Sequence, residues 1–333
     1  MNPFPTRLAG LTLLALTVLA AVAAPVLAPN DADTRFRDHV HAPPTRPRVW
    51  REGSLARPFI YRWRLVNRLE QRYELDLARP VALVWFSGGR IVRSPDPDAP
   101  LLLFGADRDG RDVFARLLHG ARASLALATV ATAGALLLGV LLGAAAGVAG
   151  RGIDATLMRV AELVLVLPTV YVVLVLRAAL PLVLPPGVVF LLMAAIFALA
   201  GWPFVARGVR GIVLAERDRE YAVAALSLGA GRARLVFRHL LPACRGFLAV
   251  QATLLVPAFI VAEATLSYVG LGFADPVASW GSMLRDGSDI TFAEFPWVLA
   301  PAGAIFLVVL AFNLIVQASP IDARGSGSRA LGA

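Results

Sequence analysis

The chain has 333 residues, of which 58% are hydrophobic, and a formal net charge of +9. Its mean hydropathy of +0.68 is too high for an ordinary soluble domain. Because all 32 Lys and Arg positions are occupied by Arg, the chain lacks the Lys of a Walker A phosphate loop and is not a P-loop ATPase. Its single cysteine, Cys244, excludes an internal disulfide and a Cys-based zinc site.

Several charge-free runs approach or exceed the ~20 residues that a helix needs to cross a bilayer. They predict an all-α integral membrane protein with six transmembrane helices. In such a protein, basic loops set the topology and contact anionic lipid headgroups. We therefore expect the lipid bilayer, and no nucleic acid, to be the partner of the positive charge.

The first domain, 1–29, contains an apolar segment from Leu8 to Leu27 behind Arg7. Its end, Ala21–Ala24, also resembles a signal-peptidase site. The length of about 20 apolar residues favours a retained transmembrane helix over a signal peptide, whose apolar region has roughly 7–15 residues.

Residues 30–104 form a predicted periplasmic module that is rich in Arg and aromatic side chains. Pro58–Asp76 has the pattern of a helix, whereas Val81–Val92 predicts a β-hairpin around Ser-Gly-Gly. His39 and His41 lack a third metal ligand nearby, so we expect solvated loop residues and no metal site.

The membrane-spanning core, 105–318, is expected to hold the other five spans. Its Asp-rich run at 107–112 lacks the spacing of a calcium loop and predicts a surface turn with local ion pairs. The second span is predicted at Ala123–Gly150. The doubled G-x-x-x-G pattern in this span lets another helix approach closely, and it comprises Gly139, Gly143 and Gly147. Packing within the chain is favoured over a dimer interface.

The remaining spans are predicted at 161–180, 187–205, 246–268 and 297–316, with a cytoplasmic tail at 319–333. In the third span, Pro168 predicts a kink. Glu162 and Arg177 lie near its two ends, where charged side chains extend to the membrane surface, so neither is assigned a transport role.

The loop 207–245 contains eight Arg and three acidic residues. The positive-inside rule places this loop and both termini in the cytoplasm, and 30–120 and 270–295 outside. Within the loop, a helix is expected to begin at Asp218 or Arg219, with acidic residues in its first turn, and to end at Gly229.

The small residues Ala222, Ala225 and Gly229 lie at i, i+3 and i+7 on this helix and offer another protein a close approach. A second helix follows, with Arg232, Arg234, Arg238 and His239. Two interpretations stay open: a docking element for a cytoplasmic partner, or an amphipathic loop lying on the membrane.

Ala224-Ala225, Gly229 and Leu241-Pro242 resemble the EAA loop of permease subunits in binding-protein-dependent ABC importers, specifically the dipeptide/oligopeptide/nickel group. Further motifs of that group are similar to 104–113, 120–122, 263–272, 279–281 and 311–314. The resemblance covers about residues 100–320. Val223 stands where the family's loop has a Glu, and Ala106 replaces a Thr.

This resemblance implies a multi-pass protein of the bacterial inner membrane, without a cofactor, metal or catalytic site. It implies a complex with a second permease subunit, two cytoplasmic ATP-binding subunits that hydrolyse the ATP, and a periplasmic substrate-binding protein. Two roles stay open for the module at 30–104: contact with this binding protein, or shielding of an outer gate. Peptides are the expected cargo, with nickel or other small solutes as alternatives. The residues that it assigns to ATPase coupling are Glu220, Ala224, Ala225, Gly229, Arg238, Leu241 and Pro242.

Glu263 is an acid inside the predicted fifth span and therefore a functional-site candidate. It either lines the translocation path or hydrogen-bonds a neighbouring helix or the Trp280 loop. An alternative function is an ATP-independent secondary transporter or channel, which would need several charged residues within its spans. A membrane-embedded enzyme would need paired catalytic groups, and His119 and His239 form no such arrangement.

Overall fold

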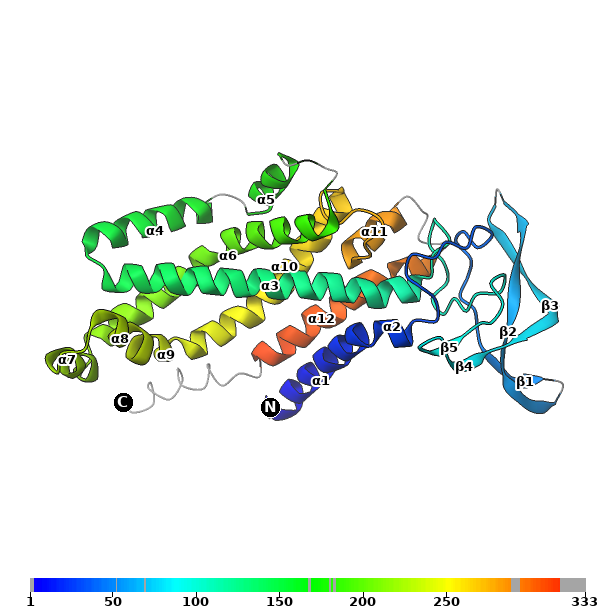
Figure 1. The fold of residues 1–333 in the computed structure, drawn as a ribbon, viewed down its shortest axis with the longest axis horizontal. Coiled ribbons are helices and arrows are strands. Elements are labelled where there is room, and N and C mark those ends of the chain that lie inside the picture. The colour runs from blue at the N-terminus through cyan, green and yellow to red at the C-terminus, as the bar shows by residue number, and fades with distance from the viewer. Residues whose placement is uncertain are drawn as a thin grey trace, which may run out of the picture. The chain divides into compact units, whose positions relative to one another are not determined.

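The computed structural model describes residues 3–51, 53–68, 70–166, 169–179, 181, 184–288 and 294–317. The chain folds into two compact units. One comprises Met1–Ser124 and Ala264–Leu314, and the other Leu125–Glu263 and Ile315–Ala333. Figure 1 shows a mostly helical chain. All of its strands belong to the first unit.

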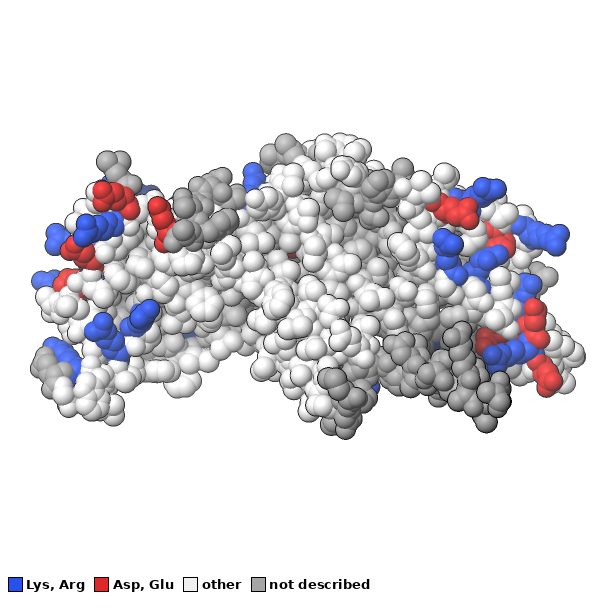
Figure 2. All heavy atoms as spheres, turned by 180° about the vertical axis from the view of Figure 1, so that it is seen from behind, with Lys and Arg blue, Asp and Glu red and all other residues white. Residues whose placement is uncertain are grey.

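Five helices among the described residues are long and apolar enough to cross a membrane. They coincide with the predicted first, second, fourth, fifth and sixth spans, and they are Pro5–Val22, Val113–Val148, Pro186–Arg217, Arg245–Val269 and Pro296–Gln317. On the face shown in Figure 2, Arg, Asp and Glu gather in patches and leave broad helical surfaces almost without charge. Such surfaces suit a hydrocarbon environment.

The third predicted span, 161–180, is divided between two elements. They are α4 (Arg151–Val166) and α5 (Thr169–Ala178), and neither is among the five long helices. The predicted kink at Pro168 and the predicted end at Leu180 lie outside the described residues. Arg177 is buried and donates a hydrogen bond to the Pro181 carbonyl (3.2 Å), so the expected extension to the membrane surface is wrong in this chain.

The first unit contains a β module. Its strands are β1 (Arg48–Arg51), β2 (Ser54–Asn67), β3 (Arg72–Ala82), β4 (Val84–Ser87) and β5 (Arg90–Arg93). The antiparallel β4–β5 pair confirms the predicted hairpin. The all-α expectation and the helix predicted at Pro58–Asp76 are wrong for this module, because this segment lies in β2 and β3, which pair in antiparallel register.

The other elements of the first unit are helices: α1 (Pro3–Val22), α2 (Ala24–Leu27), the first turns of α3 (Val113–Val148), the last turns of α10 (Arg245–Val269), α11 (Trp280–Ser288), η2 (Pro296–Leu299) and most of α12 (Ala300–Gln317). The Trp280 indole N–H donates to the Leu117 carbonyl (3.1 Å) and so anchors α11 on α3. Burying Trp with its N–H satisfied is a strong packing contribution.

The second unit is helical in its described residues. Besides most of α3 and α10 and the pair α4–α5, it contains α6 (Pro186–Arg217), α7 (Glu220–Ser227), α8 (Arg232–Leu235), the π-helix η1 (Val236–Leu240) and α9 (Leu241–Ala243). Helix α6 continues twelve residues past the predicted end of the fourth span, so the predicted loop begins as helix.

The predicted small-residue face of α3 packs within the chain. A Cβ added at Gly143 would lie 2.5 Å from the Ala206 carbonyl oxygen of α6, and one at Gly147 would lie 2.5 Å from Cγ1 of Val213. Only glycine permits so close an approach of two helices. The interpretation as intrachain packing is therefore confirmed for this face.

Candidate functional site

Helix α7 is an eight-residue helix with defined ends. Arg219, in extended conformation, precedes it, and Glu220 lies in the first turn, where an acid is favourable to the helix dipole. At the other end Gly229 has φ +82°, and the Ala230 N–H donates to the Ala225 carbonyl (3.0 Å). This left-handed Schellman-type ending is the conformation for which glycine is favoured, and it confirms the predicted helix and its end.

The inner face of α7 packs on α6. Ala222 is fully buried in a cluster with Val205, Val209 and Val213, and Ala225 packs against the same cluster. The small side chains therefore allow α7 to approach its own chain, and the expectation that Ala222 faces another protein is wrong. Ala225 is only partly buried, and its expected contact with a partner stays a prediction. Ala222 faces inward because of the valines of α6. The sequence of α7 alone does not show which of its faces packs against α6.

The outer face of α7 is apolar and exposed. Its large hydrophobic side chains, together with one from η1, are Tyr221, Val223, Leu226, Leu228 and Phe237. Leu228 is the most exposed of them, at 88%. Ala224 is exposed between them, and Glu220 and Arg238 are exposed nearby. We call these eight residues the α7 surface.

The α7 surface is tied to the end of α6 by polar contacts. The Tyr221 hydroxyl donates to Oε2 of Glu216 (2.7 Å), and Nε of Arg219 lies 3.2 Å from the same oxygen. The hydrogen bond to Glu216 raises the pKa of Tyr221. From the same turn, Nη1 of Arg217 donates to the Gly147 carbonyl of α3 (2.9 Å). A displacement of α7 would therefore be transmitted to α6 and α3.

The other predicted coupling residues have different positions. Leu241 packs against the cluster that buries Ala222. Pro242 lies in α9, which follows η1 without a break in helical conformation, shortly before α10 begins at Arg245. The predicted second helix at 232–239 is present, but it passes into the π-helix η1, which no sequence pattern indicated.

Glu263 in α10 is fully buried. Its neighbours Ala264 and Ser267 pack against Gly281 of α11, where a Cβ added to the glycine would lie 2.6 Å from Cα of Ala264. The C-terminal end of α10 is thus tightly packed against the segment that contains Trp280.

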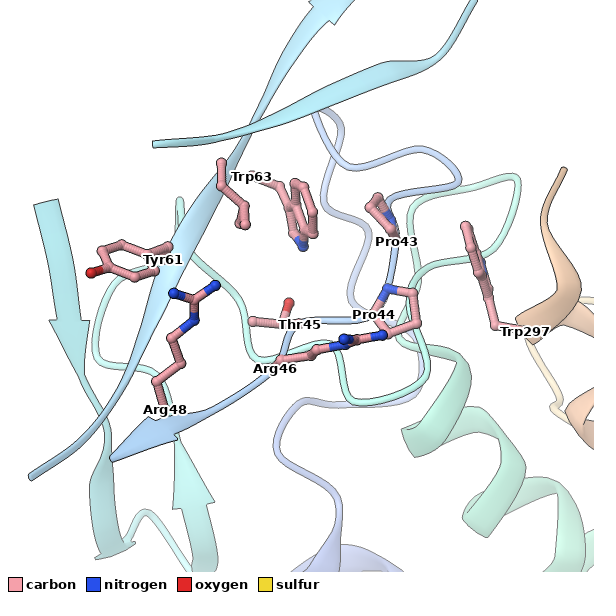
Figure 3. A pocket seen from close by; sticks show the side chains of 9 residues that line it. Pro43, Pro44, Thr45, Arg46, Arg48, Tyr61, Trp63 and Trp297 are labelled. Atoms are coloured by element: carbon pink, nitrogen blue, oxygen red, sulfur yellow. The ribbon is translucent and has the colours of Figure 1, made fainter. Parts of the chain in front are cut away.

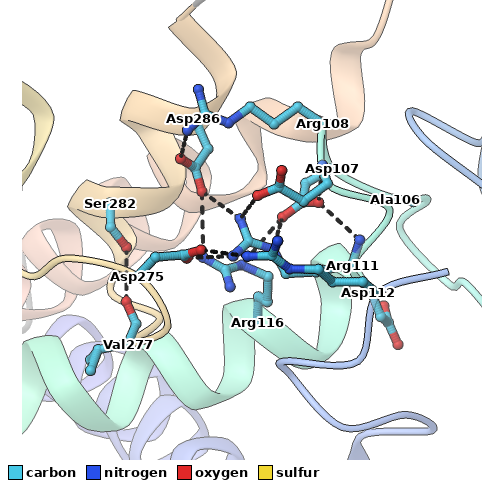
Figure 4. Close-up of polar contacts among 12 residues, drawn as sticks. Ala106, Asp107, Arg108, Arg111, Asp112, Arg116, Asp275, Val277, Ser282 and Asp286 are labelled. Atoms are coloured by element: carbon cyan, nitrogen blue, oxygen red, sulfur yellow. Dashed lines mark hydrogen bonds and ion pairs between the residues drawn. The ribbon is translucent and has the colours of Figure 1, made fainter. Parts of the chain in front are cut away.

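A buried ion-pair network lies in the first unit (Figure 4). The Arg111 guanidinium, with 2% of its side chain exposed, donates to Asp107 (2.8 Å), to Asp286 (2.9 Å) and to Asp275. Arg116 lies 3.5 Å from Asp107 and 3.4 Å from Asp286. The local ion pairs expected at 107–112 are present, since Arg111 pairs with Asp107 and with Asp109 (both 2.8 Å). The expected surface position is wrong for Asp107, Arg111 and Asp112, which are buried.

The network fixes the charge of its members. Burial opposes the ionisation of Arg111, but the carboxylates of Asp107 and Asp275 outweigh it and raise the pKa of this guanidinium. Burial likewise opposes ionisation of Asp275, and Arg111 outweighs it, so the pKa of Asp275 is lowered. The network thus joins the loop before α3 to the segment containing α11 by charged hydrogen bonds, which are the stronger kind.

His39 and His41 are also buried, contrary to the expectation of solvated residues. His41 stacks on Phe295, with ring centroids 4.7 Å apart, and Nδ1 of His41 contacts the Gln71 side chain. Among the described residues no group of three or more His, Cys, Asp or Glu could hold a metal ion.

The chain is similar to a known protein family and to several peptide permeases. The sequence pattern described as "Binding-protein-dependent transport system inner membrane component" matches residues 139–319. The chain is 37% identical to an oligopeptide transport system permease protein (OppC) of Bacillus subtilis strain 168, over 69% of this chain and 73% of the relative. It is 40% identical to a dipeptide transport system permease protein (DppC) of the same strain, over 64% and 65%.

A third relative extends the similarity into the β module. The chain is 33% identical to a di/tripeptide transport system permease protein (DppC) of Pseudomonas aeruginosa strain UCBPP-PA14, over 92% of this chain and 84% of the relative. Because so little of the chain is left out, this alignment includes most of residues 30–104.

Proposed function

Since the chain belongs to the family of binding-protein-dependent transport system inner membrane components, we propose that an ATPase subunit docks on its α7 surface. The chain is a multi-pass inner-membrane permease of an ABC importer for peptides or similar small solutes. As a binding-protein-dependent component, it works with a substrate-binding protein and an ATPase.

The observation that carries the proposal is the exposure of the α7 surface in a charged surrounding. Large hydrophobic side chains such as Leu228 and Phe237 are exposed beside Glu220 and Arg238. Burial of these charges in lipid is unfavourable, and so is exposure of the hydrophobic side chains to water. A protein partner with an apolar cleft and a polar rim satisfies both.

Val223 makes the proposed contact with the ATPase apolar at its centre. The family's loop has a Glu at this position, whereas Val223 is 51% exposed and lies between the other hydrophobic residues. We therefore propose that the ATPase of this importer presents an apolar side chain, rather than a cation, to Val223.

The contact also explains coupling. When ATP binding closes the ATPase pair, the partner displaces α7, and the Glu216 hydrogen bond and the Ala222 packing carry the displacement to α6. Helix α6 has 32 residues, and it moves α3 through the glycine face. Two such permeases, each on one ATPase, would then alternate between outward and inward access, with ATP hydrolysed by the partner subunits.

For the topology we propose six spans, with α4–α5 supplying the third, both termini and the α7 surface in the cytoplasm, and the β module outside. The Arg-rich segment around α7 supports this orientation by the positive-inside rule.

Co-purification of the ATPase with two leucine variants tests the docking proposal. Leu228→Asp places a charge in the α7 surface, and Leu55→Asp is a matched control, because Leu55 is 77% exposed on β2. Interface hot spots contribute about 2 kcal/mol or more, so we expect Leu228→Asp to lose most of the bound ATPase and Leu55→Asp to keep it. Equal retention by both variants would refute docking at this surface.

A further inference from the structure

The β module contains a cavity of about 390 Å³, which takes no part in the proposed coupling to the ATPase (Figure 3). Its lining comes from three parts of the first unit: the segment 43–48, the strands β2 and β3, and Trp297 of η2. A volume of this size lies within the range of small-ligand sites, which is about 300–1,000 Å³.

The apolar walls follow from strand geometry. Tyr61 and Trp63 lie two residues apart on β2 and so share one face, and Leu75 is the register partner of Trp63 on β3. Trp297 supplies another wall, and its indole N–H is already bonded to the Ala106 carbonyl (3.1 Å). Its ring is therefore held in place by a contact outside the cavity.

Two polar atoms in the lining have no hydrogen-bond partner among the described residues. They are the indole nitrogen of Trp63 and the hydroxyl of Thr45, whose residue is only 4% exposed. Both point into the same space in Figure 3. Buried donors are normally paired, and the indole N–H groups of Trp280 and Trp297 both are. An acceptor supplied from outside the chain would satisfy Trp63 and Thr45.

The charged side chains in the lining are all basic. The lining includes Arg46 and Arg48 but no Asp or Glu. Neither Arg forms an ion pair with a carboxylate among the described residues, and Cζ of Arg48 lies over the Tyr61 ring, 5.1 Å from its centroid. The cavity therefore offers guanidinium, indole and hydroxyl donors, and guanidinium groups preferentially bind carboxylates.

We infer that this cavity binds the free C-terminal carboxylate of a short peptide, with an apolar C-terminal side chain between Trp63 and Trp297. Arg46 and Arg48 pair with the carboxylate, and Trp63 and Thr45 donate to it or to the adjoining peptide carbonyl. The choice of a peptide over other carboxylates rests on the proposed function as a peptide permease. The module would then hold cargo on the permease itself, apart from the binding protein.

Calorimetric titration of the full-length permease in lipid nanodiscs, without binding protein or ATPase, tests the inference. The probes are the dipeptide Ala-Phe and its C-terminal amide. We expect saturable binding of the acid and at least about tenfold weaker binding of the amide, because a charge-assisted bond is lost. Arg46→Gln with Arg48→Gln should weaken acid binding by at least about tenfold as well. Trp63→Phe, which removes one neutral donor, should weaken it by about three- to tenfold.

The matched control is Arg57→Gln with Arg72→Gln, which removes the same charge from exposed strand positions outside the cavity. This control should bind Ala-Phe like the unchanged protein. Equal affinity for acid and amide, or unchanged binding by the Arg46/Arg48 variant, would overturn the inference. The inference would also be overturned if the binding protein covered the cavity and the permease bound no Ala-Phe. None of these results affects the ATPase co-purification that tests the proposed function.

Discussion

Gly143 of α3 lies so close to Ala206 of α6 that a Cβ on the glycine would be 2.5 Å from the alanine carbonyl oxygen and 3.0 Å from its Cα. Backbone cannot yield as a flexible side chain can, so an added methyl group must separate the two helices. This contact lies on the route by which the proposed function moves α3 with α6.

We therefore expect Gly143→Ala to destabilise the permease by about 1–3 kcal/mol, the usual cost of overpacking. Gly211→Ala on α6 is the control, because an added Cβ there would have no atom of the described residues within 4 Å. Both changes raise helix propensity equally. Thermal unfolding in detergent measures the difference, and equal melting temperatures would show that the helices separate freely at Gly143.

The end of α7 provides a second prediction. Gly229 has φ +82°, and a side chain in the left-handed region costs about 1–2 kcal/mol. Gly229→Ala should therefore loosen the last turn of α7, whereas Gly231→Ala, at a glycine without positive φ and with open space, should not. Hydrogen exchange of the Ala230 amide, which bonds to the Ala225 carbonyl, reports the loosening. Exchange that is equally fast in both variants would contradict a role for the left-handed ending.

Local sequence signals could predict α7 because its acid, alanines and glycine lie within ten residues. They could not show which face is inward, since Ala222 is buried by Val205, Val209 and Val213 of another helix. In the β module, Tyr61-Arg62-Trp63-Arg64-Leu65 alternates as a strand does, but the helix-favouring residues after Leu65 obscured that period.

The burial of the ion-pair network could not be predicted from local sequence either. The turn at 107–112 supplies Asp107 and Arg111, and these were expected to pair at the surface. The burial depends on Asp275 and Asp286, which are 164 and 175 residues from Arg111 in sequence. No local pattern relates residues so far apart.

This network leads to a third prediction. Arg111→Gln would remove the cation that bonds Asp107 most closely and leave it only the more distant Arg116 (3.5 Å). Breaking a buried ion pair typically costs about 3–5 kcal/mol. Arg35→Gln is a matched control, because Arg35 pairs with the same Asp275 but has 56% of its side chain exposed. Exposed pairs contribute at most about 1 kcal/mol. Unfolding of both variants in detergent gives the comparison, and similar stabilities would mean that Arg111 is not the centre of the network.

Asp112 provides a pH-dependent prediction. Complete burial raises its pKa from 3.8 to about 6, although hydrogen bonds from Asn30 and the Phe114 N–H (2.9 Å) partly oppose the effect. The folded state therefore binds a proton more tightly than the unfolded state. The resulting stabilisation is complete below pH 3.8 and is lost as the pH rises through about 6. One pKa unit corresponds to ~1.4 kcal/mol, so the loss amounts to about 3 kcal/mol.

Asp112→Asn removes this titration but keeps an acceptor for the Phe114 N–H, which caps α3. The unfolding free energy of the variant, relative to the unchanged protein, should rise by about 2.5 kcal/mol between pH 4 and pH 7.5. Because the other carboxyl groups titrate alike in both proteins, their contributions cancel in this difference. Chemical unfolding at several pH values measures it. A difference that stays constant over this range would show that Asp112 ionises in the folded protein as readily as in the unfolded chain.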